Sequence, residues 1–350
     1  MCAREADMLV VRLAQLQDLQ AIVELAQSTG GGLTNLPPDE ATLSSKLAHA
    51  VNTHQNLVTH ADGLFWFVLE DTDTEKLVGV SGIEAAIGMD QACYTYRVST
   101  IVHSCKTLDV YHQFPTLFLT SDHSGASELC SLYLHPQFRH SKAGALLSKC
   151  RFLFMAQHPG LFADKIIAEL RGYLDENGLS PFWEGLGRHF FDIEFSQADY
   201  LTALNQKQFI AELMPRYPFY TRFLPAAAQQ VIGKVHRQTE PAKKLLEHEG
   251  FRYEGCVDIF DAGPTLECYV NRVRAIRDSY LASRLQVEAL QGYPLLVSNP
   301  HRTEFRCTLL MPDSHGIYPQ DMEQLWSLLQ LAPDEKARCI VLNREPGHHE

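Results

Sequence analysis

Residues 127–157 read SELCSLYLHPQFRHSKAGALLSKCRFLFMAQ, and they contain the clearest structural pattern in the chain. Residues 127–134 form a short, largely apolar run that stops at His135-Pro136, which is typical of a buried strand. From residue 143 to residue 158 the apolar side chains recur at helical spacing. The stretch therefore predicts a strand, a polar loop and an amphipathic helix in direct succession.

The chain before this stretch predicts further elements of both kinds. Strands are expected at 8–14, 64–71, 76–87, 94–102 and 116–120. A helix follows Asp18 and stops at Gly30-Gly31-Gly32, and Pro37-Pro38 open a second helix. A short acidic turn at 71–74 makes the strands on either side of it an antiparallel pair.

The chain after this stretch continues the alternation and then changes character. Strands are expected at 165–170 and 190–195, a helix opens at Ser180-Pro181, and residues 197–232 are mainly helical. Beyond residue 277, short strands surround small helices. We therefore expect a main α/β domain at 8–277, with a helical insertion at about 197–232, and a small β-rich C-terminal domain at 278–350. Residues 1–7 are expected to be a disordered extension.

Composition excludes several classes of function. The chain has 350 residues, 45% of them apolar, and a formal net charge of -12, so binding to nucleic acid is not expected. Its longest apolar run, at 64–69, is only as long as a strand, so no membrane span is expected. Its nine cysteines are odd in number and widely spaced, which indicates reduced thiols, a cytoplasmic protein and no metal site. The first residues lack the apolar core of a signal peptide.

The order of these elements resembles that of the GNAT superfamily of acyl-CoA-dependent N-acyltransferases. Several longer segments resemble the arginine N-succinyltransferase family within it. They are 29–36 (TGGGLTNL), 115–119 (PTLFL), 127–130 (SELC), 180–183 (SPFW), 210–215 (IAELMP) and 261–267 (DAGPTLE). The resemblance runs from about residue 8 to residue 277. It implies transfer of the succinyl group of succinyl-CoA to the α-amino group of L-arginine, the first step of an arginine-degrading pathway. No permanently bound cofactor is implied.

The loop from Arg139 to Ala145 resembles the pyrophosphate-binding loop of GNAT enzymes, whose pattern is R/Q-x-x-G-x-G/A. Arg139, Gly144 and Ala145 match that pattern, whereas Lys142 replaces its first glycine. In such loops, backbone N–H groups at a helix N-terminus face the phosphates. The alternative interpretation is a plain helix start. If the site needed a positive φ, Lys142 would be strained there.

The resemblance also places a backbone contact to succinyl-CoA at Leu132 and the proton donor at His236. Thioester aminolysis leaves a thiolate that needs a proton, and histidine can supply one near neutral pH. The chain has 16 histidines, so residue type alone does not single out His236. For Leu132 the alternative is an ordinary core leucine.

Other candidates carry open alternatives. His123 is either a contact to the succinyl carboxylate or solvated surface, and surface is favoured. Arg97 and Arg171 are expected to form structural salt bridges, although each can bind a carboxylate bidentately. Glu84 and Glu169 either receive the guanidinium of arginine or form ion pairs, because a buried carboxylate needs a partner. Three core or strand residues carry no proposed chemistry, namely Cys130, Phe182 and Trp183.

Three alternatives remain for the function as a whole. The fold can serve ornithine instead of arginine, or acetyl-CoA instead of succinyl-CoA. The protein can also be a non-catalytic subunit or effector-binding module that keeps the GNAT fold. A homo-oligomer or pairing with a paralogous subunit is expected.

Overall fold

The computed structural model describes residues 9–29, 33–55, 62–139, 142–203, 213–290 and 292–342, so the expected extension at 1–7 lies outside it. The described strands join in one sheet, in the order β11-β14-β12-β13-β1-β2-β3-β6-β7-β10-β9-β4-β5-β8. The strands are β1 (Leu9–Leu13), β2 (Leu64–Asp71), β3 (Lys76–Glu84), β4 (Thr95–Cys105), β5 (Val110–Thr120), β6 (Ser127–Leu134), β7 (Lys165–Glu169), β8 (Phe219–Tyr220), β9 (Arg252–Val257), β10 (Pro264–Tyr269), β11 (Tyr280–Ala282), β12 (Leu295–Ser298), β13 (Arg306–Leu310) and β14 (Ala337–Val341). The helices are α1 (Leu19–Gln27), α2 (Glu40–His54), α3 (Ala143–Gln157), α4 (Pro181–Gly185), α5 (Arg188–Phe191), α6 (Phe195–Ala203), α8 (Ala226–Val231), α9 (Glu240–His248), α10 (Arg274–Arg277), α11 (Arg284–Ala289) and α12 (Met322–Leu328). The predicted α/β class is confirmed.

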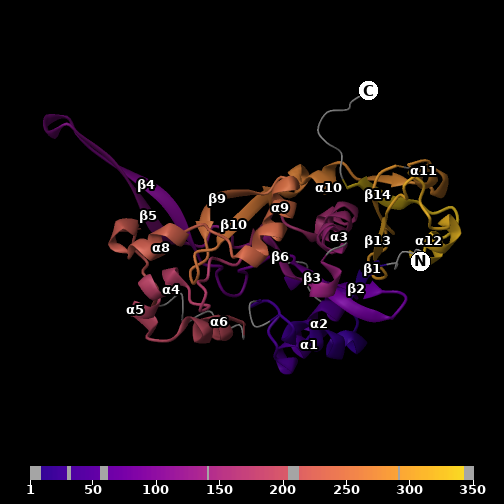
Figure 1. Cartoon of the computed structure of the whole chain (residues 1–350), viewed down its shortest axis with the longest axis horizontal. Coiled ribbons are helices and arrows are strands. Elements are labelled where there is room, and N and C mark those ends of the chain that lie inside the picture. The colour runs from indigo at the N-terminus through magenta and orange to yellow at the C-terminus, as the bar shows by residue number, and fades with distance from the viewer. Residues whose placement is uncertain are drawn as a thin grey trace.

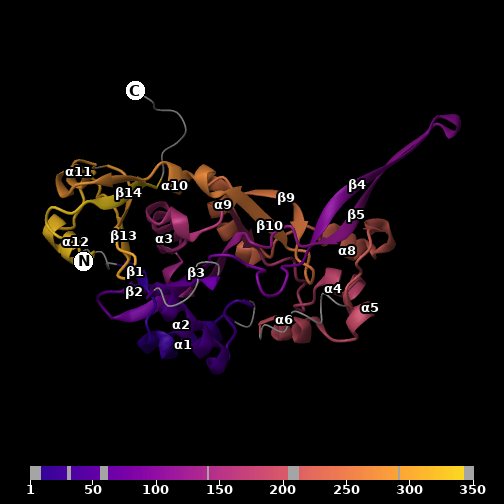
Figure 2. The same cartoon turned by 180° about the vertical axis from the view of Figure 1, so that it is seen from behind.

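The strand β2 is covered on both faces, which explains its unbroken apolar run. Phe65 and Phe67 pack into the core that contains α3, whereas Trp66 and Val68 pack toward α1 and α2. Successive side chains of a strand point to opposite faces, so an apolar residue at every position indicates two covered faces. Figures 1 and 2 show α1 and α2 on one side of these strands and α3 on the other.

The strands β6 and β7 are parallel and pair over a short distance. Ser127 lies opposite Ile166, and Glu128 lies opposite Ile167. Beyond these two positions no pairing joins the described residues of the two strands. The sheet therefore opens in a V between β6 and β7, which is the arrangement expected of a GNAT-type fold.

The C-terminal residues extend the same sheet. The strand β13 pairs with β1, with Val10 opposite Thr308, so the sheet continues from one region into the other. Leu296 and Cys307 contribute to the main core, whereas Trp326 belongs to a separate cluster with α11, α12 and β14. The expected strands and small helices are present, and we keep residue 278 as a proposed domain boundary.

Two segments enlarge the fold at its other end. The strands β4 and β5 form a long hairpin that projects from the body of the molecule (Figure 1). Residues from α4 to α8 pack against its base around Trp183. The strand expected at 190–195 was wrong, because residues 188–191 form the helix α5 and α6 begins at Phe195. Phe191 and Phe195 instead pack against Trp183. The expected helical region at 197–232 contains α6 and α8, with the short strand β8 between them.

Candidate active site

A bulge in β6 lies where that strand leaves β7. Val80 of β3 pairs with Tyr133 and Gly82 pairs with Cys130, so one residue of β3 faces two residues of β6. One of those two, Ser131, has a φ of 54° and is buried. A bulge redirects the backbone next to it. The other extra residue is Leu132, so the structure puts this predicted contact on irregular backbone beside the V.

The predicted pyrophosphate loop runs from the end of β6 to the start of α3. The Nε atom of Arg139 donates to the Leu134 carbonyl at 3.0 Å, and its guanidinium lies 5.7 Å from the centre of the Tyr133 ring. Lys142 has a φ of -74°, so the strain considered for a lysine at this position does not arise. His140 and Ser141 lie outside the described residues.

The glycine of this loop is not required by packing. Among the described residues, and apart from its chain neighbours and the helix's own backbone, the nearest atom to a Cβ added at Gly144 would be the Leu134 Cδ2 atom at 3.8 Å. Its φ is also not in the left-handed region. Ala145, the next residue, is half-buried and packs against the main core. The small side chain at 144 therefore leaves room at the helix N-terminus without being needed for the fold.

His236 is held at the end of β7, across the V from Leu132. Val235 bridges to Gly172, and the His236 backbone N–H donates to the Arg171 carbonyl at 2.8 Å. Arg171 lies four residues beyond Ile167, and Leu132 lies four residues beyond Glu128, the partner of Ile167. Leu132 and His236 therefore lie beyond the last paired positions of β6 and β7, on opposite sides of the opening.

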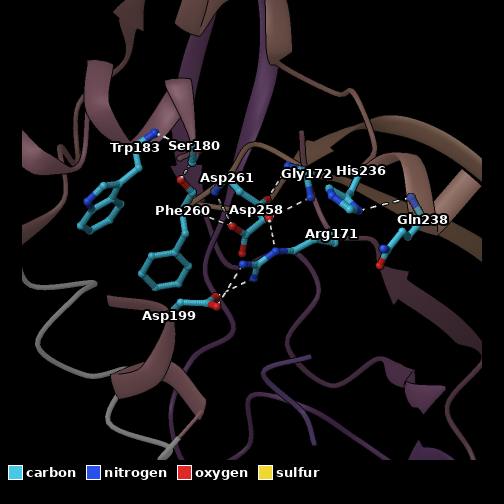
Figure 3. Close-up of polar contacts among 11 residues, drawn as sticks. Arg171, Gly172, Ser180, Trp183, Asp199, His236, Gln238, Asp258, Phe260 and Asp261 are labelled. Carbon is cyan, nitrogen blue, oxygen red and sulfur yellow. Dashed lines mark hydrogen bonds and ion pairs between the residues drawn. The ribbon is translucent and has the colours of Figure 1, made fainter. Parts of the chain in front are cut away.

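The imidazole of His236 has a defined hydrogen bond on one side. Its Nδ1 atom accepts from the Gln238 backbone N–H at 3.2 Å, which favours the neutral tautomer with its proton on Nε2 (Figure 3). Burial lowers the pKa of His236 below its usual value, and the nearby positive charges of Arg171 and Arg237 lower it further. Its imidazolium form is thus a stronger acid than that of an ordinary histidine.

Arg171 joins this site to a group of carboxylates that the sequence did not single out. Its guanidinium binds both oxygens of Asp199, at 2.6 and 3.0 Å, and lies 3.5 Å from Asp261. It also lies 5.0 Å from the centre of the Phe195 ring. Figure 3 shows the guanidinium pointing away from His236 toward these acids. The structural salt bridge expected for Arg171 is confirmed.

Asp261 organises the loop that supports His236. Its two oxygens accept from the backbone N–H groups of Gly172 and Gly263, each at 2.8 Å. Burial, followed by the charge of nearby Asp258, raises the pKa of Asp261 to about 8. Asp261 lies in the segment 261–267, but its partners Arg171 and Gly172 come from a distant part of the chain, so composition and spacing gave no signal for its role.

The surface position favoured for His123 was wrong. The ring is 1% exposed, and its Nε2 atom lies 3.0 Å from a carboxylate oxygen of Glu267 on β10. Lys165 binds the same oxygen at 3.1 Å. The expected salt bridge of Arg97 is confirmed, because its guanidinium binds Asp122 at 3.0 Å.

Glutamates from three neighbouring strands share the face of the sheet opposite α3. Glu84 lies opposite Glu128. Glu128 pairs with Ile167 of β7, and Glu169 lies two residues after Ile167 on the same strand. Alternation along each strand puts all three carboxylates on one face beside the start of the V. Glu128 is buried, whereas Glu84 and Glu169 are half-buried. The three carboxylates give this face of the sheet an acidic character.

The remaining candidates are structural. Phe182 and Trp183 are fully buried, as expected, and burial raises the pKa of the Cys130 thiol far above its usual value. A thiol held protonated is a poor nucleophile, in agreement with the strand role predicted for Cys130. Within the described ranges, no group of three or more histidine, cysteine or acidic side chains is arranged to hold a metal ion. No helix in the same ranges is long and apolar enough to span a membrane.

Comparisons with known proteins identify the family to which this chain is similar. A family model described as arginine N-succinyltransferase beta subunit matches residues 9–275. A Citrobacter koseri protein named arginine N-succinyltransferase is 51% identical over 308 residues, 87% of this chain and 90% of its own length. An Escherichia coli protein of the same name is 50% identical, with the same coverage. The solved structure of arginine/ornithine succinyltransferase subunit AI from Pseudomonas aeruginosa is 32% identical, covers 97% of this chain and 100% of its own, and superposes with a TM-score of 0.85.

Proposed function

The chain belongs to the arginine N-succinyltransferase family, and from this premise we propose that it transfers the succinyl group of succinyl-CoA to the α-amino group of L-arginine. The observation that carries the proposal is identity of about half the residues with named arginine N-succinyltransferases over nearly their whole length. The open V between β6 and β7 supports it, because it offers a place for an extended acyl-CoA arm beside irregular backbone.

In this proposal the acyl-CoA lies along β6 and crosses the start of α3. Its pyrophosphate faces Arg139 and the helix N-terminus at Gly144 and Ala145, where the helix dipole favours negative charge. The pantetheine arm pairs with backbone at Leu132, on the side of β6 that faces the V. Room beside Gly144 supports this path, because a side chain there would fill the space next to the loop.

The acceptor amine attacks the thioester carbon directly, so no acyl-enzyme forms. Attack places negative charge on the carbonyl oxygen, and backbone N–H groups near the bulge are suited to bind it. The nitrogen becomes positively charged when it bonds to the carbon, and it then releases one proton to water. When the C–S bond breaks, the sulfur takes the bonding electron pair and needs a proton. We assign that proton to His236, whose lowered pKa favours giving it up.

The acidic face next to the V is the proposed acceptor site. Glu84 and Glu169 lie there on strands on either side of β6. A guanidinium binds carboxylates through two parallel hydrogen bonds, which fixes its orientation. Ornithine is a second candidate acceptor, because the similar Pseudomonas aeruginosa protein is named an arginine/ornithine succinyltransferase subunit.

Two further expectations accompany this function. We place the reaction in the cytoplasm, because every cysteine in the described ranges is free. We also propose that the chain pairs with a second copy or with a paralogous subunit. The hairpin of β4 and β5 supports pairing, because it exposes Ile101, Val102 and Leu108 to solvent.

The test is the initial rate of thiol release by the purified chain. Four mixtures are compared: succinyl-CoA or acetyl-CoA, each with arginine or ornithine. The proposal expects the fastest release with succinyl-CoA and arginine. A site with partners for a second carboxylate loses them with acetyl-CoA, and such a mismatch reduces catalytic efficiency strongly. Equal efficiency with the two thioesters, or no release with either amine, would contradict the proposal.

A further inference from the structure

Arg151 places a charge on the buried face of α3. The side chain is 1% exposed. Its Nη1 atom donates to the carbonyl oxygens of Gly82 and Cys130, at 3.2 and 3.5 Å. Its Nε atom donates to the carbonyl of Ser148 at 3.0 Å. Across the described ranges, no carboxylate forms an ion pair with this guanidinium.

A buried charge of this kind opposes folding. An ion without a counter-charge loses its hydration and regains only part of that energy from neutral dipoles. Lys149, two residues earlier, shows the contrast. It is 3% exposed, but its ammonium group binds the carboxylate of Glu249 at 2.6 Å. Packing alone would be satisfied at position 151 by an apolar side chain of similar length.

The carbonyls that Arg151 binds lie beside the bulge. Gly82 and Cys130 face each other across β3 and β6 at the last regular pair before Ser131. The Cys130 carbonyl also belongs to the same peptide group as the Ser131 N–H. A hydrogen bond to the oxygen of a peptide polarises the group and makes its N–H a stronger donor.

We propose that Arg151 is a positioning residue for acyl transfer, which fixes the bulge at Ser131 and polarises the Ser131 backbone N–H toward the thioester oxygen. This inference rests on the proposed function. Arg151 touches neither substrate and acts through the backbone of β6.

The reaction requires such a donor at one step. When the amine nitrogen bonds to the thioester carbon, the π electron pair of the carbonyl moves to its oxygen. The Ser131 backbone N–H stabilises that charge until the pair returns and the C–S bond breaks. Arg151 keeps its proton throughout. Burial lowers its pKa to about 10, which still leaves it charged near neutral pH.

The test compares Arg151→Met, Arg151→Lys and a control, Lys149→Met, which removes another buried charge from the same helix without touching the bulge. For each variant, three quantities are measured: kcat at saturating substrates, the dissociation constant of CoA, and Tm. CoA has no thioester carbonyl, so its affinity reports the binding groove alone.

Removing one oxyanion donor typically reduces kcat by about 10²–10³-fold, so removing a residue that acts through the donor should reduce it by roughly 10–100-fold. We expect this reduction in Arg151→Met, with CoA affinity unchanged within about twofold and partial recovery of kcat in Arg151→Lys. Lys149→Met should lower Tm but keep the kcat of the folded protein.

Three outcomes would overturn the inference. The first is a folded Arg151→Met with the kcat of the unmodified protein. The second is a fall in CoA affinity that matches the fall in kcat. The third is an equal loss of kcat in Lys149→Met. If Arg151→Met does not fold, Arg151→Gln is judged by the same measurements. If the unmodified protein does not transfer succinyl groups to arginine, the proposed function is wrong, and this inference falls with it.

Discussion

Replacing Gly144 by leucine should weaken acyl-CoA binding without weakening the fold. In the part of the chain that the structure describes, the nearest atom outside the helix backbone to a Cβ at this position would be Leu134 Cδ2 at 3.8 Å, an ordinary van der Waals contact. The backbone φ does not favour glycine, and leucine has a better helix propensity by up to about 1 kcal/mol. Tm should therefore stay the same or rise.

The leucine side chain would occupy the space that we assign to the pyrophosphate. Loss of the close approach to the helix N-terminus should raise the dissociation constant of succinyl-CoA by tenfold or more, which corresponds to about 1.4 kcal/mol. Isothermal titration calorimetry with CoA and with succinyl-CoA measures this directly. A useful control is Gly160→Leu, just beyond the other end of α3, where a Cβ would also meet open space.

A Gly144→Leu variant with an unchanged or raised Tm and a weakened affinity for succinyl-CoA would have lost the binding site and not the fold. The control variant should bind both ligands as the unmodified protein does. If Gly144→Leu is folded and binds succinyl-CoA with unchanged affinity, the loop from Arg139 to Ala145 is not the pyrophosphate site.

Three other substitutions test the remaining parts of the site. His236→Asn should reduce kcat by about 10²–10⁴-fold and leave CoA affinity unchanged. It should also abolish the limb of the kcat–pH profile that lies below the usual histidine pKa. Near-normal turnover in the folded variant would remove His236 from the mechanism. Glu84→Gln should raise the KM for arginine by about tenfold, because a hydrogen bond to a charged group is lost, and leave the KM for succinyl-CoA unchanged; equal effects from the control Glu288→Gln on the far surface would refute this. Asp261 has a pKa of about 8 in the folded protein, so the stability that its protonated form contributes is present at low pH and is lost as pH rises from the pKa of the unfolded state to about 8. The Tm of Asp261→Asn should therefore fall less than that of the unmodified protein between pH 6 and about pH 9. Parallel Tm curves for the two proteins would contradict the assignment.

The fold was predictable where local sequence and final environment agree. The stretch 127–157 contains a strand, a loop and a helix whose patterns need no distant partner, and the structure has β6 and α3 there. The same holds for β2, whose continuous apolar run indicates two covered faces. The family resemblance then supplied what periodicity cannot, namely roles for Leu132 and His236, which stay proposals.

Predictions failed where distant segments decide the environment. His123 lies in a polar segment that is typical of surface, but Glu267, 144 residues away, gives it a buried partner. The aromatic residues at 190–195 looked like a strand because they are bulky and close together, whereas they pack as short helices around Trp183. In both cases tertiary contacts outweighed local preference.

Arg151 is a different case, because the sequence did contain a signal. The apolar face predicted for the helix from 143 to 158 includes Leu147 and Phe154, and a side chain at 151 lies one turn from each of them. A charge at such a position predicts a specific partner. The identity of that partner, two carbonyls beside a bulge, required the register of β3 and β6.

Identification of the product formed from succinyl-CoA and arginine tests the proposed function of this chain directly. The purified chain is incubated with both, and the arginine product is analysed by mass spectrometry and by NMR of the nitrogen that carries the new amide. We expect one succinyl group on the α-amino nitrogen and one equivalent of free CoA for each product formed. Succinylation of the guanidinium, or CoA release without acylated arginine, would contradict it.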